Sequence, residues 1–175
     1  KEYMKNKERY GGNWENSLIG GHILGHYMSA VAQGIVNPGV TAEQKEKLTE
    51  RLNYIIDSLA DCQKKTEGVT GIEGYIFGAT LPSSEFKKNV VLQFDNVESG
   101  KTNISTQAWV PWYTMHKILA GLTDAYEVAG NETALEVANK LATWIADRAN
   151  SWDTSTQNKV LSVEYGGMND ALYQL

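Results

Sequence analysis

Charged residues gather in every second helical segment of this chain, and this alternation limits the fold more than any other feature. Residues 16–40 contain no Asp, Glu, Lys or Arg, whereas residues 41–64 contain nine residues of these four types. The contrast repeats between 109–130 and 131–150, and a fifth, sparsely charged helix is expected near 162–175. Helical hairpins that pair an inner, covered helix with an outer, amphipathic one build layered rings. The pattern predicts that helices one, three and five are inner and that helices two and four are outer.

The segment 16–40 has the spacing of a helix with two different faces. One face is apolar and comprises Ile23, Leu24, Tyr27, Met28, Val31 and Ile35. The opposite face carries the neutral polar residues His22, His26, Ser29 and Gln33. A helix without charges is usually buried on most sides. A polar stripe on such a helix indicates that it faces a wet cavity.

Residues with known capping preferences mark the ends of the other helices. Thr41 and Gln44 predict a capping box at the start of the second helix, which we expect to end at about residue 64. Gly130 is expected to end the third helix, and Asn131 to cap the fourth.

These elements predict an all-α fold made of helical hairpins that form part of an (α/α)6 toroid. No fixed repeat of about 34 or 40 residues is found, so a closed ring is favoured over a solenoid. Five helices cannot close such a ring, and residues 1–175 are therefore predicted to be a single partial domain. Between the two hairpins, "NVVLQF" and "KTNIST" flank "DNVESG" and can form a small β-hairpin insertion near 86–106.

Composition excludes several classes of partner and cofactor. The net charge of −5, with both signs mixed along the chain, gives no basic footprint for nucleic acid or anionic membrane. No run approaches the roughly 20 apolar residues of a membrane span. The single cysteine, Cys62, rules out an internal disulfide and a metal site of several thiolates within this chain. The charged start "KEYMKNKERY" is no signal peptide, and the sequence leaves open whether the protein is secreted or cytoplasmic.

The stretch "WVPWYTMHK" places several aromatic side chains at the start of the third helix, where Pro111 suits the first helical position. Trp112 and His116 lie one helical turn apart, at the edge of its apolar stripe. In a ring of hairpins, Trp112 can stack on the C–H face of a sugar while His116 bonds a hydroxyl group. The alternative is that both tryptophans of the stretch pack under the hairpin and His116 bonds a backbone carbonyl.

Two further groups of residues are candidates for a binding site. His22 and His26 have HxxxH spacing, but "HILGH" lacks the Glu of a zinc protease motif, so we expect a polar lining rather than a metal site. Glu164 is a candidate carboxylate in "VEYGGMND", where Gly166 and Gly167 allow close approach of a ligand. The alternative interpretation is that the negative charges of Glu164 and Asp170 only stabilise the N-terminus of a helix. We predict that His22 or His26 shares one cavity with His116 and Glu164.

The start of the chain combines the same residue types as the segment around Glu164, namely a glycine pair, an aromatic residue and a carboxylate. In "YGGNWEN", Trp14 and Glu15 follow a Gly-Gly pair, and Trp14 is a further candidate for sugar contact. No phosphate-binding loop, dinucleotide fingerprint or nucleophile elbow is present.

The chain resembles glycoside hydrolase family 127, formerly the domain of unknown function 1680. Five motifs carry the resemblance, in this order: "YGGNWENSLIGGHILGHYMSA", "CQ…GYI", "WVPWYTMHKILAGLTDAY", "AGNETALEVANKLATW" and "EYGGMND". The resemblance implies an (α/α)6 catalytic toroid, followed by β-sandwich regions, that removes β-L-arabinofuranosyl units from glycans. It also implies that His116 contacts the sugar and that the Gly-Gly loop with Glu164 lines the same pocket. The chain departs from the family in an apparent insertion at 82–107 and in "GGNWEN", which is one residue longer than the usual "GGWE". It also has Asp170 where relatives commonly have Glu.

Members of this family use a cysteine nucleophile in a zinc site of cysteines and a glutamate, with a second glutamate as acid/base. The resemblance places those motifs after Leu175, so this chain matches the front half of the toroid. We therefore assign no catalytic residue and no metal ligand within the chain, and expect zinc only in the full-length domain. Cys62 is expected to be a buried, inert thiol, and the isolated chain to be inactive and to self-associate through uncovered apolar faces. The alternative function is a non-catalytic helical scaffold for protein partners.

Overall fold

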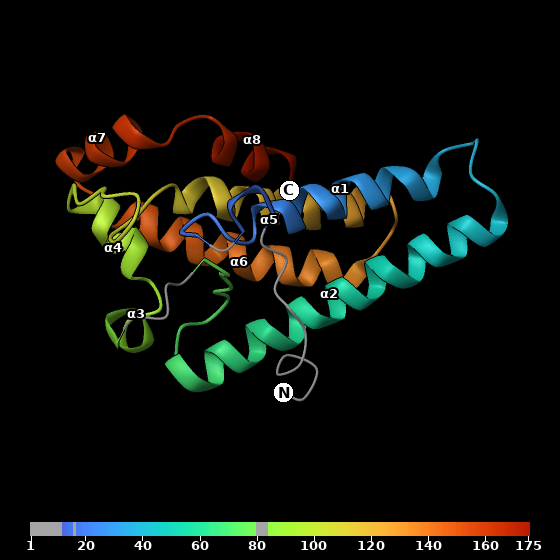
Figure 1. Cartoon of the computed structure of the whole chain (residues 1–175), viewed down its shortest axis with the longest axis horizontal. Coiled ribbons are helices and arrows are strands. Elements are labelled where there is room, and N and C mark those ends of the chain that lie inside the picture. Colours follow the sequence, from blue (N-terminus) through green and yellow to red (C-terminus); the bar gives the residue numbers. More distant parts are fainter. Residues whose placement is uncertain (1–11, 16, 80–83) are drawn as a thin grey trace.

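The computed structural model describes residues 12–15, 17–79 and 84–175, without the side chain of Asn13. This part of the chain is all-helical and has no strand (Figure 1). A 3-10 turn at Gly12–Trp14 precedes the helices α1 (His22–Val36), α2 (Ala42–Thr70), α3 (Ser84–Lys88), α4 (Leu92–Glu98), α5 (Pro111–Glu127), α6 (Glu132–Asn150), α7 (Thr154–Val163) and α8 (Gly167–Gln174). The predicted all-α class is confirmed.

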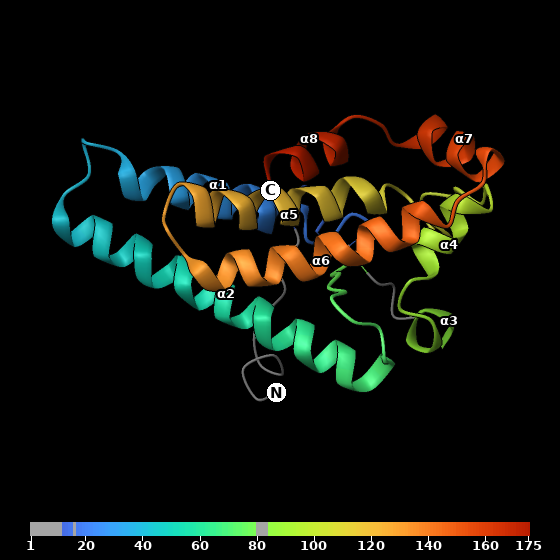
Figure 2. The same cartoon turned by 180° about the vertical axis from the view of Figure 1, so that it is seen from behind.

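Two helical hairpins, α1–α2 and α5–α6, lie side by side and run in the same direction (Figures 1 and 2). Along the inner pair, Gly21 meets Thr114 and Gly25 meets Lys117, so contacts advance together and α1 is parallel to α5. In the outer pair, Asn131 Nδ2 donates to Asn53 Oδ1 at 2.8 Å, and α2 is likewise parallel to α6. Parallel inner helices backed by parallel outer helices are consistent with an (α/α) toroid-type arrangement.

Glycine permits the close approach of α1 to α5. A Cβ at Gly25 would lie 2.1 Å from the Lys117 carbonyl oxygen, and one at Gly121 would lie 2.7 Å from the Gly25 carbonyl oxygen. No side chain fits between these backbones, so the two inner helices touch directly.

The burial of the hairpin helices follows their charge content. α5 buries ten of its 17 residues and α1 six of 15, whereas α2 buries only Leu52, Ile56 and Gln63 among 29. The prediction of inner and outer helices is confirmed for both hairpins. The fifth sparsely charged segment forms α8, which packs on the inner helix α5 and buries Ala171 alone, and its inner position stays a prediction.

The predicted helix ends are largely confirmed. Thr41 and Gln44 form the capping box, and the Asn131 side chain accepts a hydrogen bond from the Ala134 N–H. The second helix is longer than expected, since it continues past residue 64 to Thr70 and ends at Gly71. Sequence reasoning missed α7, which the Asp153 side chain caps by accepting from the Thr156 N–H.

The β-hairpin expected near 86–106 is wrong. Residues 92–98 form α4, in which Phe94 and Val97 are buried three positions apart. This spacing brings both side chains to one face of a helix, where they enter the main core. Burial in the core has overridden the strand preference of the β-branched residues. Residues 82 and 83 of the apparent insertion lie outside the described part of the chain.

Cys62 is exposed, which corrects the expectation of a buried thiol. Its neighbour Gln63 turns inward instead, and the Gln63 amide donates to the carbonyls of Gly74 at 2.7 Å and Val137 at 3.1 Å. Because adjacent helix positions differ by about 100° in direction, Cys62 points away when Gln63 faces α6.

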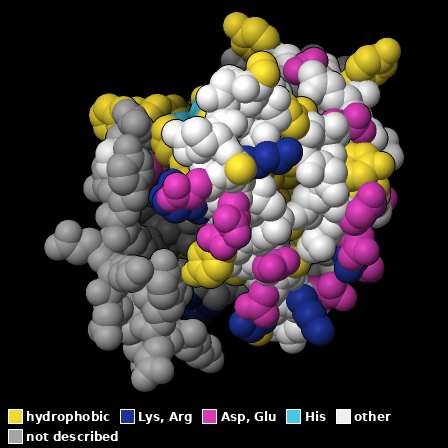
Figure 3. All heavy atoms as spheres, turned by 90° about the vertical axis from the view of Figure 1, so that its right-hand side faces the viewer, with side chains coloured by type: hydrophobic (Ala, Val, Ile, Leu, Met, Phe, Trp, Pro, Cys, Tyr) yellow, Lys and Arg dark blue, Asp and Glu magenta, His cyan; other side chains and the backbone are white. Residues whose placement is uncertain are grey.

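On the molecular face shown in Figure 3, acidic and basic side chains lie close to one another, and acidic ones are the more frequent. Among the described residues, no helix is both long enough and apolar enough to cross a bilayer.

Candidate functional site

A cavity of about 630 Å3 lies where α5 begins, and we call it the α5 cavity. Its walls come from the first two turns of α5, the second half of α6, α7 and the segment 164–169 that leads into α8. Figures 1 and 2 show α7 and α8 along the same edge of the molecule, joined by this segment. The cavity is lined by five of the predicted site residues: Trp112, His116, Glu164, Gly166 and Gly167.

Glu164 joins the end of α7 to the start of α5. Its Oε2 accepts a hydrogen bond from the Tyr113 N–H at 2.6 Å, although 51 positions separate the two residues. The α5 helix has no side-chain cap of its own, so this carboxyl group satisfies a free N–H at its N-terminus. Oε1 is buried and has no partner among the described residues.

Burial raises the pKa of the Glu164 carboxyl from 4.5 to about 7, while hydrogen bonds from the backbone of Tyr113 and Trp112 act in the opposite direction. The side chain can therefore change its charge near neutral pH without moving into water.

His116 is half-buried and lies against the Gly-Gly loop. A Cβ at Gly167 would lie only 2.6 Å from the imidazole, so glycine is needed for this approach. Burial, followed by the nearby charge of Lys117, lowers the pKa of His116 from 6.5 to about 4. The Tyr113 backbone and Asp170 act in the opposite direction. At neutral pH the ring is an uncharged donor and acceptor.

Trp112 lies in the aromatic core behind the cavity wall. It is 5% exposed, and its ring centroid is 4.8 Å from that of Phe94 and 5.3 Å from that of Trp152. The geometry is that of the packing alternative, although Trp112 also lines the cavity. Its Nε1, like that of Trp152, is buried without a partner in the part of the chain that the structure describes.

Trp14 stands on the surface beside the cavity wall. It is 67% exposed, and the edge of its ring meets Trp109, a lining residue, at a centroid distance of 5.7 Å. Its backbone has a φ of 67°, an unusual conformation for a bulky residue. Of the motif "YGGNWEN", Tyr10, Gly11 and Asn16 lie outside the described residues.

The two histidines of α1 do not line the α5 cavity, which corrects the expectation of one shared cavity. They lie beyond Tyr113, whose ring centroid is 6.1 Å from that of His22 and 5.2 Å from that of His116. We call His22, His26, Tyr113 and His116 the histidine face. His22 is buried, whereas His26 is largely exposed. The pKa of His26 is lowered, first by partial loss of its hydration and then by the charges of Lys117 and His22.

Sequence reasoning missed Tyr113 as the link between the two parts of the site, and Trp152 as a wall of the cavity. Tyr113 is part of the stretch "WVPWYTMHK". Its position one helical turn before His116 and Lys117 is the signal that could have identified it. Trp152 follows α6 in a short connection, and no local pattern predicts where such a residue points.

The described residues contain no group of three His, Cys, Asp or Glu side chains placed to hold a metal ion. The only thiol of the chain, that of Cys62, belongs to the exposed side of α2. These residues do not fit a zinc site of several cysteines.

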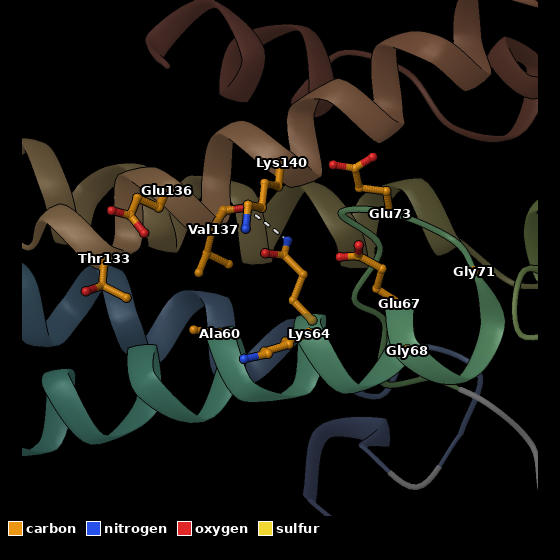
Figure 4. A pocket seen from close by; sticks show the side chains of 11 residues that line it. Ala60, Lys64, Glu67, Gly68, Gly71, Glu73, Thr133, Glu136, Val137 and Lys140 are labelled. Atoms are coloured by element: carbon orange, nitrogen blue, oxygen red, sulfur yellow. Dashed lines mark hydrogen bonds between the residues drawn. The ribbon is translucent and has the colours of Figure 1, made fainter.

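A second hollow, of about 800 Å3, lies between α2 and α6 (Figure 4). Its lining carries both charge signs, with Glu67, Glu73 and Glu136 beside Lys64 and Lys140. The dashed line in Figure 4 is the hydrogen bond from Gln63 to the Val137 carbonyl. None of the predicted site residues lines this hollow, so the α5 cavity is the better candidate.

Stacked helical hairpins with an aromatic cavity at the start of an inner helix are consistent with part of an (α/α) toroid-type domain. A family model described as β-L-arabinofuranosidase, GH127 catalytic domain, matches residues 1–175. The chain belongs to this family, and membership supports a glycoside hydrolase function and a carbohydrate substrate. The comparison with curated proteins gives no match.

Proposed function

We propose that the α5 cavity and the histidine face bind a β-L-arabinofuranosyl unit in a glycoside hydrolase that removes such units from glycans. The observation that carries the proposal is the neutral His116, held against Gly167 in a cavity that also contains the buried carboxyl of Glu164. An uncharged imidazole can both accept from and donate to sugar hydroxyl groups. Trp109 and the exposed Trp14 supply aromatic surface for the C–H groups of a sugar ring.

In this proposal the residues of the chain bind and orient the sugar, and none of them is the nucleophile. A thiol nucleophile must be deprotonated beside the bond that it attacks. Cys62 lies on α2, whereas the cavity is walled by α5 to α8. His22, His26, Trp112 and Gly166 complete the set of proposed sugar-contacting residues, with Trp112 acting through the cavity wall.

The test is the binding of methyl β-L-arabinofuranoside, followed by the fluorescence of the tryptophans that surround the cavity. His116→Ala is expected to weaken binding by about tenfold, because one well-formed hydrogen bond to the sugar is lost. The matched control is Lys64→Ala in the second hollow, which should bind as the unaltered protein does. Equal affinities for His116→Ala and the unaltered protein, with the same circular dichroism spectrum, would contradict the proposal.

A helical scaffold for protein partners is the second candidate, and exposed apolar side chains on and before α8 favour it. Tyr165 is 84% exposed and Tyr173 is 91% exposed, and Leu172, which precedes Tyr173 in the sequence, is 36% exposed. Exposed apolar side chains can serve an interface when they form a contiguous patch. Replacing Tyr173, which does not line the α5 cavity, with Ser should leave sugar binding intact if the first proposal is right, and a loss of self-association in the same variant would support the second.

A further inference from the structure

The inference concerns Glu15 and His22, at the start of α1. The Nδ1 atom of His22 lies 2.9 Å from the Ile19 carbonyl oxygen and 3.0 Å from Oε1 of Glu15. A carbonyl oxygen can only accept a hydrogen bond. Which ring nitrogen carries the hydrogen therefore depends on whether the Glu15 oxygen is also an acceptor.

The other contacts of Glu15 answer this question. Oε2 accepts from the Gly21 N–H at 2.6 Å, and Oε1 accepts from the Ile23 N–H at 2.9 Å. Both oxygens of the carboxylate face backbone donors, so the ionised, acceptor-only form suits every contact. Nδ1 of His22 then lies between two acceptors and must carry the hydrogen.

The helix start keeps Glu15 in this place. Gly21 precedes α1 with a φ of 106° and offers no side-chain cap, so the Glu15 carboxylate takes the role of one. The Glu15 side chain is 13% exposed and that of His22 is 11% exposed. Because the carboxylate binds the backbone of α1 at two points, it holds the imidazole from a fixed position.

A neutral histidine with a hydrogen on Nδ1 has a bare lone pair on Nε2. No hydrogen-bond partner of Nε2 is found among the described residues. The ring lies beside Tyr113 in the histidine face, at a centroid distance of 6.1 Å. The free nitrogen is thus an acceptor at the proposed sugar site.

We propose that Glu15 is a positioning residue that holds His22 in the Nδ1–H form, so that Nε2 accepts a hydrogen bond from a ligand hydroxyl group. The role as a hydroxyl acceptor rests on the proposed sugar-binding function, whereas the hold of Glu15 on His22 does not. The site is therefore specific for a hydrogen-bond donor on the ligand and discriminates against an analogue in which that hydroxyl is replaced by hydrogen or methoxy.

The first measurement is the tautomer of His22, read from long-range 1H–15N spectra of the neutral imidazole rings. His22 is expected as the Nδ1–H form in the unaltered protein. In Glu15→Gln and Glu15→Ala, the Nε2–H form should appear, because one of the two acceptors at Nδ1 is weakened or lost. Glu43→Gln, which removes an exposed carboxylate near the start of α2, is the matched control and should leave His22 unchanged.

The second measurement is the affinity for methyl β-L-arabinofuranoside. Glu15→Gln should weaken binding by about the same factor as His22→Ala, roughly tenfold, and the double variant should lose no more than either single one. A purely structural role of Glu15 would instead lower thermal stability in Glu15→Gln without any change of tautomer.

The outcomes separate the two proposals. An Nε2–H form of His22 in the unaltered protein overturns the inference, whatever the sugar affinity. An Nδ1–H form together with no sugar binding overturns the proposed function and with it the role of Nε2 as hydroxyl acceptor. Selective broadening of the His22 and His26 signals by equimolar Zn2+, with no response to the sugar, would assign Nε2 to a metal and also overturn the inference.

Discussion

At the level of single residues, two glutamates far apart in the sequence each cap the N-terminus of an inner helix. The Glu15 carboxylate satisfies N–H groups at the start of α1, and the Glu164 carboxyl satisfies that of Tyr113 at the start of α5. In both helices the residue at the N-cap makes no side-chain hydrogen bond. Glu15 also contacts His22, and Glu164 lines the same cavity as His116, so the groups that cap the inner helices also shape the place where a sugar would bind.

The pKa of Glu164 makes stability depend on pH. The folded-state pKa of about 7 lies above the ordinary value of 4.5, so the folded protein binds this proton more tightly than the unfolded chain. The contribution to the free energy of unfolding is complete below about pH 4.5 and is lost as the pH rises through about 7, on the order of 3 kcal/mol in all. Urea denaturation between pH 4 and pH 8 should show this loss in the unaltered protein relative to Glu164→Gln.

His116 acts in the opposite direction, because its folded-state pKa of about 4 lies below 6.5. Its contribution is present above about pH 6.5 and is lost as the pH falls through about 4. The difference between the unaltered protein and Glu164→Gln isolates the glutamate, since both contain His116. A difference that stays constant across the range would contradict the prediction.

Gly167 is predicted to set the position of His116. In Gly167→Ala, the new Cβ would lie 2.6 Å from the imidazole, and the ring must move because it is the more easily displaced group. Affinity for methyl β-L-arabinofuranoside should fall to about that of His116→Ala, while the fold is kept. Gly68→Ala is the control, since a Cβ there would meet no atom within 4 Å. Unchanged sugar affinity in Gly167→Ala would show that the site does not need this contact.

At the level of elements, the direct contact between α1 and α5 holds the two hairpins in register. Gly25 and Gly121 lie at this crossing, and the Thr114 hydroxyl faces the Ile19 carbonyl at 3.5 Å near its start. The contact aligns the beginnings of both helices. Glu15, His22 and Tyr113 consequently lie within reach of one another, and the site depends on how closely the helices approach.

Gly25→Ala should therefore destabilise the protein. The added Cβ would lie 2.1 Å from the Lys117 carbonyl oxygen and 2.8 Å from the Ile118 nitrogen, and backbone atoms cannot rotate away. Separating the helices should cost at least about 1–3 kcal/mol, the usual range for overpacking. Chemical denaturation measures the change. Gly68→Ala, in the interior of α2, should instead be neutral or stabilising by up to about 1 kcal/mol, and an equal effect of both changes would refute the argument.

At the level of the whole molecule, the cavity and the only thiol belong to different parts of the fold. The cavity is walled by α5 to α8, whereas Cys62 is exposed on α2, the outer helix of the other hairpin. A sugar bound as proposed would meet histidines, a carboxyl group and aromatic rings, but not the thiol of this chain.

The purified chain is thus predicted to bind arabinofuranosides without hydrolysing them. Incubation with a nitrophenyl β-L-arabinofuranoside should release no nitrophenol above the uncatalysed rate. The exposed Cys62 should react with a thiol reagent in the folded protein, and this reaction should leave sugar binding unchanged. Hydrolysis that the same reagent abolishes would contradict the prediction.

The sequence by itself determined the features that depend on neighbours along the chain. The capping box at Thr41, the cap at Asn131 and the contrast between inner and outer helices all follow from residues three or four positions apart, which a helix brings together wherever it lies. The motif around His116 and the Gly-Gly pair of 166–167 were likewise readable, because their residues are contiguous. Tertiary structure decided the rest. It made α4 a helix through the burial of Phe94 and Val97, and it exposed Cys62 by turning Gln63 toward α6. It also separated the histidines of α1 from the cavity and brought Glu164 to Tyr113, because a contact across 51 positions depends on how whole helices pack and leaves no periodic trace in the sequence.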